Sequence, residues 1–367
     1  MANLSIGIIG LPNVGKSTLF NALLKKQAAL AANYPFATIE PNTGIVPVPD
    51  ARLTTLAEIT KTEEGMSESP PIKQALVEFV DIAGLVKGAS EGAGLGNKFL
   101  ANIREVKIVA HVVRVFEDGD VIKEGAVDPK SDYETIRYEL LLADLQTLTN
   151  INEKSLRTDA VKKSAVEKLT KELSAGKNAF EVALTDEEKD SIRDLNLLSS
   201  KNELIVLNVS ENQYNDAEIP GIIDQYAGIM QMPKDRFVVI SAKIESELAE
   251  LGEDEAKEYL QELGVEKSGL ERLINKAYEN LGLISFLTAG EKEVRAWTTK
   301  VGANAVEAAG EIHTDFMQKF IKAEVVSFND FVENTGWKGS REKGKAGMQG
   351  RDYIMQDGDV VEFKIGR

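Results

Sequence analysis

The feature that most constrains the fold is a glycine-containing loop close to the start of the chain. Residues 10–17 read Gly-Leu-Pro-Asn-Val-Gly-Lys-Ser and fit the pattern GxxxxGK[ST]. The apolar run 6–9 before them is typical of a buried strand, and residues 17–24 after them have helical spacing. Such a unit turns backbone N–H groups toward phosphate oxygens, with Lys16 near the β- and γ-phosphates and the Ser17 hydroxyl on Mg²⁺. We therefore predict that the chain binds a nucleoside triphosphate.

Composition narrows the remaining possibilities. The 367 residues are enough for two or three domains, and the net charge of −16 restricts any nucleic-acid contact to local basic patches. The absence of cysteine excludes disulfides and thiol catalysis, and two histidines, His111 and His313, are too few for a histidine-rich metal site. Apolar runs are too short to cross a membrane and the chain lacks a signal segment at its start, so we expect a cytoplasmic protein.

Short apolar runs alternate with helical stretches along much of the chain. This alternation indicates βαβ units and a parallel sheet covered on both faces. The runs that we predict as strands are residues 5–9, 76–81, 108–115, 204–209 and 237–241.

Two regions interrupt the alternation. Residues 131–200 start with a capping-box pair, Ser131 and Glu134, and continue as two amphipathic helices, which predicts an inserted antiparallel helical hairpin. Its lysines are either a solvated face or a basic binding surface; they include Lys162, Lys163, Lys168 and Lys171.

The second region begins near residue 284 and is rich in strand-like sequence. Residues 284–288 and 359–365 are predicted strands, and 303–309 a short helix, so we expect a small separate β-rich domain. A basic stretch at 338–345 follows Trp337. Cationic loops beside an aromatic ring suit RNA, although a plain surface loop is the alternative.

A phosphate loop requires further groups for Mg²⁺ and for the γ-phosphate. Asp81 ends a predicted strand and opens the pattern DxxG, whose Gly84 N–H can contact the γ-phosphate while the carboxylate reaches Mg²⁺ through water. In the proline-bounded segment 33–42 we choose Thr38 as the loop threonine that closes on Mg²⁺, with Thr43 as its competitor.

The choice of base depends on the loop after the strand at 204–207. GTP-binding proteins usually carry NKxD there, and its aspartate accepts two guanine donors. This chain has Asn208-Val209-Ser210-Glu211, so the guanine-specific contact is lost and we infer ATP over GTP. Residues 241–243 read Ser-Ala-Lys and resemble the loop that contacts the base through backbone N–H groups.

Together these motifs resemble the YchF-type Obg-like ATPases over essentially the whole chain. The stretches that carry the resemblance are GLPNVGKST at 10–18, NYPFATIEPNTG at 33–44, DIAGLVKGAS at 81–90, NVSE at 208–211 and SAKIE at 241–245. The resemblance implies an α/β P-loop NTPase, G-domain-like, of the OBG type over 1–130 and 201–282, a helical hairpin over 131–200 and a β-grasp-like TGS domain over 283–366.

The resemblance also implies a set of site residues. For the phosphates they are Asn13, Val14, Gly15, Lys16, Ser17 and Thr18, and for the base Val209, to which the two base loops add Asn208, Glu211, Ser241 and Ala242. The implied Mg²⁺ ligands are Ser17 and Thr38, to which the DxxG pattern adds Asp81.

The chain departs from the GTPase pattern at the catalytic position. Leu85 stands where Ras-like enzymes have a water-orienting glutamine, and Lys123 aligns with the histidine that resemblance to the family implies. We therefore expect slow hydrolysis, with Lys16, Gly84 and Lys123 as catalytic residues and Lys123 stabilising charge on the γ-phosphate. His111 lies inside a predicted strand and is expected to be a core residue.

By this resemblance the chain is expected to be an ATP-hydrolysing switch that binds ribosomes, either the large subunit or a 70S-type particle, and acts in translation or stress regulation. RNA contact is expected through the TGS domain and the hairpin, in a monomer, with Mg²⁺ as cofactor. Asn13 is placed to hold K⁺ against the phosphates. The alternatives are an Obg-class GTPase and a non-catalytic RNA-binding protein that holds nucleotide structurally.

Overall fold

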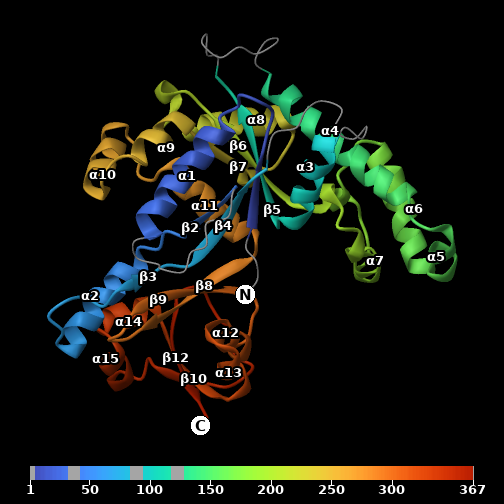
Figure 1. Cartoon of the computed structure of the whole chain (residues 1–367). Coiled ribbons are helices and arrows are strands. Elements are labelled where there is room, and N and C mark those ends of the chain that lie inside the picture. The colour runs from blue at the N-terminus through green and yellow to red at the C-terminus, as the bar shows by residue number, and fades with distance from the viewer. Residues whose placement is uncertain (1–4, 32–41, 83–93, 117–127, 367) are drawn as a thin grey trace. The chain divides into compact units, whose positions relative to one another are not determined.

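The computed structural model describes residues 5–31, 42–82, 94–116 and 128–366. These residues form two compact units, whose elements are labelled in Figure 1. Of the described residues, the large unit takes those from 5 to 46 and from 78 to 273, and the small unit takes 47–77 and those from 274 onward.

A six-stranded sheet forms the centre of the large unit, in the order β2-β4-β1-β5-β6-β7. β1 pairs in parallel with β4 and β5, and β6 pairs in parallel with β5 and β7. The strands are β1 (Ser5–Ile9), β2 (Thr43–Pro47), β4 (Leu76–Asp81), β5 (Ile108–Arg114), β6 (Asn202–Asn208) and β7 (Phe237–Ile240). The predicted parallel sheet is thus confirmed, and β2 is an edge strand that the proline-rich sequence did not indicate.

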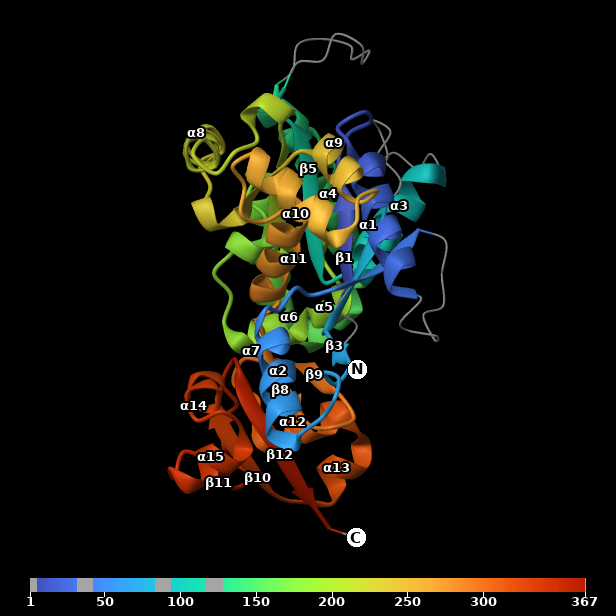
Figure 2. The ribbon, with the colours of Figure 1, turned by 90° about the vertical axis from the view of Figure 1, so that its left-hand side faces the viewer.

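Helices cover both faces of this sheet (Figures 1 and 2). One apolar cluster joins the sheet to α3 and to the helical insertion, and a second joins it to the helices that follow β6 and β7. The helices outside the insertion are α1 (Lys16–Ala31), α3 (Gly94–Glu105), α8 (Ile219–Met230), α9 (Ala242–Leu248), α10 (Glu253–Glu262) and α11 (Gly269–Asn280).

The predicted insertion is helical and starts earlier than expected. The side chain of Asp128, not of Ser131, accepts the backbone N–H groups of Lys130 and Ser131 at 3.1 Å each, and Pro129 takes the first helical position. The correction has a physical reason, because proline fits the first turn of a helix and an aspartate before it caps the free N–H groups. The helices are α4 (Pro129–Thr149), α5 (Glu153–Thr158), α6 (Ala160–Ser174) and α7 (Asp186–Ser191).

The small unit contains a mixed sheet in the order β11-β10-β12-β8-β9-β3. Helices α12 (Ala305–Ile312) and α13 (Thr314–Gln318) contribute to an apolar core with Phe286, Phe320 and Val325. The strands are β3 (Ile72–Lys73), β8 (Leu283–Ala289), β9 (Val294–Lys300), β10 (Phe320–Ser327), β11 (Gly347–Gln349) and β12 (Asp359–Ile365).

Residues 47–77 pack in the small unit although they precede most of the large unit in sequence. They supply α2 (Arg52–Glu64) and β3, which pairs in parallel with β9. The Arg52 guanidinium binds Asp357 at 2.7 Å, a contact between residues 305 positions apart. The predicted boundary of the nucleotide-binding domain, 1–130, did not anticipate this exchange, because a helix and a short strand do not reveal their packing partner in sequence.

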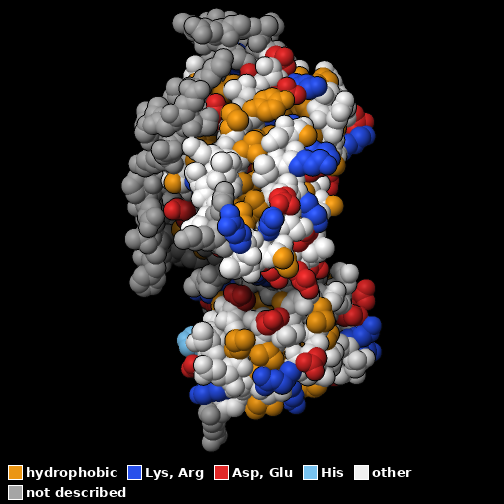
Figure 3. Space-filling view, turned by 90° about the vertical axis from the view of Figure 1, so that its right-hand side faces the viewer, with side chains coloured by type: hydrophobic (Ala, Val, Ile, Leu, Met, Phe, Trp, Pro, Cys, Tyr) orange, Lys and Arg blue, Asp and Glu red, His pale blue; other side chains and the backbone are white. Residues whose placement is uncertain are grey.

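The basic stretch at 338–345, which was expected to be a loop, is helical up to Glu342, and its last three residues follow the helix. The helix is α15 (Trp337–Glu342), next to α14 (Phe328–Glu333). Arg341 binds both oxygens of Glu324 at 2.8 and 2.9 Å, and Lys345 binds Asp330 at 2.8 Å. Figure 3 draws a different face, the right-hand side of Figure 1, where basic and acidic side chains of the described residues are interspersed.

His111 is a core residue, as predicted, with 1% of its surface exposed. Its Nδ1 lies 3.0 Å from the Glu203 carboxylate, which also accepts the Tyr133 hydroxyl at 3.0 Å. Within the described ranges no helix is long and apolar enough to cross a membrane.

Candidate nucleotide site

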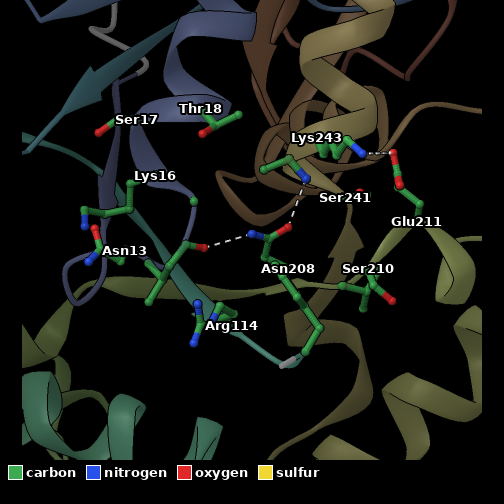
Figure 4. Close-up of a pocket in the computed structure, with 15 residues that line it drawn as sticks. Asn13, Lys16, Ser17, Thr18, Arg114, Asn208, Ser210, Glu211, Ser241 and Lys243 are labelled. Atoms are coloured by element: carbon green, nitrogen blue, oxygen red, sulfur yellow. Dashed lines mark hydrogen bonds and ion pairs between the residues drawn. The ribbon is translucent and has the colours of Figure 1, made fainter. Parts of the chain in front are cut away.

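A pocket of about 540 Å³ lies in the large unit at the carboxyl ends of the parallel strands (Figure 4). Parallel sheets bind ligands at this edge because the loops after several strands meet there. Three loops contribute: the phosphate loop after β1, the loop after β6 and the loop after β7, together with the end of β5. The lining residues are Asn13 to Thr18, Arg114, Phe116, Asn208 to Glu211 and Ser241 to Lys243.

Two glycines hold the phosphate loop in its shape. Gly15 has a φ of +99°, and a Cβ added there would lie 2.3 Å from Asn208 Nδ2. Gly10 has a φ of +153°, and a Cβ there would lie 2.5 Å from the Val112 carbonyl oxygen. A side chain at position 10 would therefore clash with strand β5, and one at position 15 with Asn208 at the end of β6. The loop thus requires glycine at both positions.

Lys16 lines the phosphate end of the pocket, whereas Asp81, at the end of β4, interacts with the Lys16 charge without lining the pocket itself. Lys16 is 7% exposed, and its Nζ donates to the Leu11 carbonyl at 2.7 Å. Burial lowers the pKa of Lys16 while the Asp81 charge opposes that shift, and burial likewise raises the pKa of Asp81 while Lys16 opposes it. Both groups are thus held where their charged forms are costly without a ligand of opposite charge.

Ser17 and Thr18 begin helix α1 and are exposed on the pocket wall (Figure 4). The Ser17 hydroxyl and the Asp81 carboxylate are hard oxygen donors, the type that Mg²⁺ prefers. The residues present therefore fit a magnesium–phosphate complex.

Asn208 connects two of the loops rather than pointing freely into the pocket. Its Nδ2 donates to the Val14 carbonyl at 2.9 Å, and its Oδ1 accepts the Ala242 N–H at 2.9 Å (Figure 4). Both polar ends of the amide are used, so Asn208 fixes the phosphate loop against the loop after β7. The sequence predicted Asn208 as a site residue, and its two hydrogen bonds show that it holds these two loops in position.

At the far end of the pocket, the residues after Asn208 differ from a guanine site. Val209 is 1% exposed, and its N–H donates to the Ile240 carbonyl at 2.8 Å. Of the two polar backbone groups of Val209, the N–H is therefore used within the protein, and the carbonyl is the one left to contact a base. Glu211 forms an ion pair with Lys243 at 2.8 Å (Figure 4). The Ser241 hydroxyl is buried and has no hydrogen-bond partner among the described residues.

The structure therefore gathers eleven predicted phosphate- and base-site residues in one pocket. They are Asn13, Val14, Gly15, Lys16, Ser17, Thr18, Asn208, Val209, Glu211, Ser241 and Ala242. Thr38, Gly84, Leu85 and Lys123 lie outside the described residues. Thr43, the competitor of Thr38, is described and begins β2.

Sequence reasoning missed Arg114 and Phe116, which line the same pocket. The Arg114 guanidinium lies over the Phe116 ring, 5.6 Å from its centroid. The available signal was a charged residue at the carboxyl end of an otherwise apolar strand, at the edge where the predicted motifs also end.

A parallel sheet with a phosphate loop after its first strand, and asparagine and serine loops after two later strands, defines a P-loop protein of the GTPase type. Residues 5–153 match the family model described as 50S ribosome-binding GTPase. Residues 283–366 match the model for the C-terminal domain of YchF GTPases, which is described as a protein of unknown function.

The chain belongs to the YchF family. It is 47% identical to the ribosome-binding ATPase YchF of Haemophilus influenzae, with 98% of each chain covered, and 45% identical to that of Bacillus subtilis, with 99% of each covered. It is also similar to the solved structure of the Schizosaccharomyces pombe YchF GTPase, at 34% identity and a TM-score of 0.83, over 99% of this chain and 98% of that one.

Proposed function

We propose that this protein is a slow ATP-hydrolysing switch whose nucleotide state controls its binding to ribosomes. The observation that carries the preference for ATP is the base end of the pocket. Glu211, at the position of the guanine-binding aspartate, is ion-paired with Lys243, and Val209 replaces the lysine of the GTPase motif. Relatives at 45–47% identity are named ribosome-binding ATPases, which supports the same reading.

The proposed roles of residues 13–18 follow their positions in the pocket, and those of Thr38, Gly84 and Lys123 follow the sequence pattern alone. Lys16 neutralises the β- and γ-phosphates, and the N–H groups of residues 13–18 bind their oxygens. Ser17, Thr38 and Asp81 hold Mg²⁺, which would offset charge on the phosphates when bound. Gly84 contacts the γ-phosphate and Lys123 stabilises the charge that develops there during hydrolysis.

Titration of the purified chain with ADP and with GDP tests the choice of nucleotide. We expect ADP to bind at least about tenfold more tightly, because the aspartate that accepts both guanine donors is replaced by Glu211, which is paired with Lys243. Equal affinities, or tighter GDP binding, would favour the alternative, an Obg-class GTPase. A Lys243→Ala variant frees Glu211 and should raise GDP affinity more than ADP affinity.

Turnover separates an enzyme from a scaffold that holds nucleotide structurally. Single-turnover ATP hydrolysis should be slow and should fall in Lys123→Ala, whereas an unchanged rate in that variant would remove Lys123 from the mechanism. Equal rates in K⁺ and Na⁺ buffers would likewise remove the proposed K⁺ ion at Asn13.

For the partner, we propose ribosomal RNA contacted by the small unit and by the helical insertion, in a monomeric cytoplasmic protein. The cations of the small unit that support an RNA surface are Lys338 and Lys343, because Arg341 and Lys345 are paired with acids. Cosedimentation with ribosomes in ADP and in a non-hydrolysable ATP analogue tests the switch, and equal binding in both would contradict it.

A further inference from the structure

Arg114 ends strand β5 and lies on the wall of the nucleotide pocket (Figure 4). Only 3% of its surface is exposed. Its Nη1 is buried and has no hydrogen-bond partner among the described residues. The guanidinium therefore lies inside the protein, beside a cavity, with a donor that no described residue uses.

Such a group is costly unless an anion is brought to it. A guanidinium stays charged at every pH at which proteins are folded, so it cannot relieve the cost of burial by losing its proton. The guanidinium lies over the Phe116 ring, 5.6 Å from its centroid, and this cation–π contact is weak compared with an ion pair.

The other cations of the pocket are already engaged. Lys243 is paired with Glu211, and Lys16 donates to the Leu11 carbonyl and interacts with Asp81. Among the cations that line the described pocket, Arg114 is the one with a buried nitrogen that has no hydrogen-bond partner, and its neighbours on the wall include the phosphate loop from Asn13 to Thr18.

We propose that Arg114 is a nucleotide-binding residue whose guanidinium pairs with the phosphate chain of the bound nucleotide. The proposal rests on the proposed function in one respect, that the pocket binds a nucleotide. A planar fork of N–H donors matches two oxygens of a phosphate group, and the burial of the Arg114 guanidinium strengthens such a pair. Arg114 would then add a second, permanent positive charge to the one that Lys16 supplies.

The test compares Arg114→Met and Arg114→Lys with the wild type. Arg236→Met is the matched control, because Arg236 Nη1 also lacks a described partner and its guanidinium lies 4.4 Å from the Phe180 ring centroid, but it does not line the pocket. Affinities for ADP and for inorganic diphosphate, the latter by competition, are measured together with melting temperatures in the absence and presence of ADP.

We expect Arg114→Met to bind ADP and diphosphate about tenfold to a hundredfold more weakly, by a similar factor for both. Arg114→Lys should recover part of the loss, since it keeps the charge without the fork. The melting temperature of Arg114→Met without ligand should equal or exceed that of the wild type, because the variant removes an unpaired buried charge. Arg236→Met should keep wild-type affinities.

Three results would overturn the proposal. A lower melting temperature of Arg114→Met without ligand, together with wild-type affinity for ADP, would mean that Arg114 pairs with a carboxylate of the chain. Loss of ADP affinity with unchanged diphosphate affinity would move the contact to the base or ribose. A wild-type chain that binds neither ADP nor GDP would remove both this proposal and the proposed function, whereas ADP binding without ATP turnover would remove only hydrolysis.

Discussion

In the small unit, one arginine joins two glutamates that face each other across neighbouring strands, whereas in the large unit a buried arginine has a donor without a described partner. Glu324 and Glu362 are opposite each other on β10 and β12, and Arg341 binds both at 2.8–3.0 Å. Arg114 has no such arrangement. Arg341 therefore stabilises the fold of the small unit, whereas the Arg114 guanidinium keeps a donor for the nucleotide that we propose.

The largest expected effect comes from removing a charge of the nucleotide pocket, and it concerns catalysis. We expect Lys16→Ala to lower the rate of ATP hydrolysis by at least about a hundredfold, because it removes the cation placed for the phosphates. Single-turnover hydrolysis measures the effect, with Lys25→Ala as control. Lys25 is on the same helix, is paired with Glu250 at 2.5 Å and does not line the pocket, so its variant should retain activity. Comparable loss in both variants would contradict the assigned role.

The second effect is on the phosphate loop itself. Gly15→Ala should destabilise the protein by about 3 kcal/mol, because it combines a positive φ with a clash against Asn208. In the small unit, Gly344 also has a positive φ, of +69°, but nothing lies within 4 Å of an added Cβ. Gly344→Ala should therefore cost only about 1 kcal/mol in urea unfolding. Equal costs would mean that the approach of Asn208 to the loop is unimportant.

The third effect is on the long-range packing of the small unit. The Glu63 carboxylate accepts the backbone N–H groups of Trp337 at 3.0 Å and Lys338 at 2.5 Å, and so caps α15 from α2. Glu63→Ala should cost about 1–2 kcal/mol, since two N–H groups lose their acceptor. Glu63→Gln keeps one acceptor oxygen and should cost less. Urea unfolding that gives the same midpoint for all three chains would show that this cap contributes nothing.

The smallest expected effect is a difference in pH dependence between the units. Hydrogen bonds from Arg341 hold the pKa of Glu324 below its usual value of 4.5. The Glu324 carboxylate therefore stabilises the folded state fully when the pH is above 4.5, and this stabilisation is lost as the pH falls through the lower pKa of the folded state. Burial raises the pKa of Asp81 above 3.8. The folded state therefore binds the proton of Asp81 more tightly than the unfolded state, and this group favours the folded state as the pH falls.

Glu324→Gln should therefore be less stable than the wild type at about pH 7 and closer to it at about pH 3. The difference should remain below about 1 kcal/mol, because Arg341 is half exposed and its pair is screened by water. Urea midpoints at the two pH values measure it. A difference that grows toward acid pH would reverse the sign derived for this carboxylate.

Much of the large unit could be predicted from sequence because its signals are local. The strand at 5–9 and the glycines at 10 and 15 lie within one short stretch, and the strand positions 76–81, 108–115, 204–209 and 237–241 agree with the structure within one or two residues. From the sequence, the N-terminal cap of α4 was predicted at Ser131, three residues after the observed cap at Asp128. Both residue types suit that position, and only the structure distinguishes them.

The pairing of distant residues was not predictable in the same way. Nothing local in residues 47–77 indicates that α2 and β3 pack in the small unit, or that Glu63 lies beside Trp337. Likewise, Arg114 was visible as a charged strand end, but its burial and its position on the pocket wall depend on how β5 pairs with β1 and β6.

By itself, the sequence determined that this chain has a phosphate loop on a parallel sheet and that its base-recognition loop departs from the guanine pattern. Both depend on residue types at fixed local spacing, since a tight turn needs glycine and a base contact needs a particular side chain. Tertiary structure decided which charges are paired, as in Arg341 with its glutamates and Glu211 with Lys243, and which are not, as in Arg114. Charge pairing depends on distances between residues far apart in the chain, which only the folded arrangement of strands and helices sets.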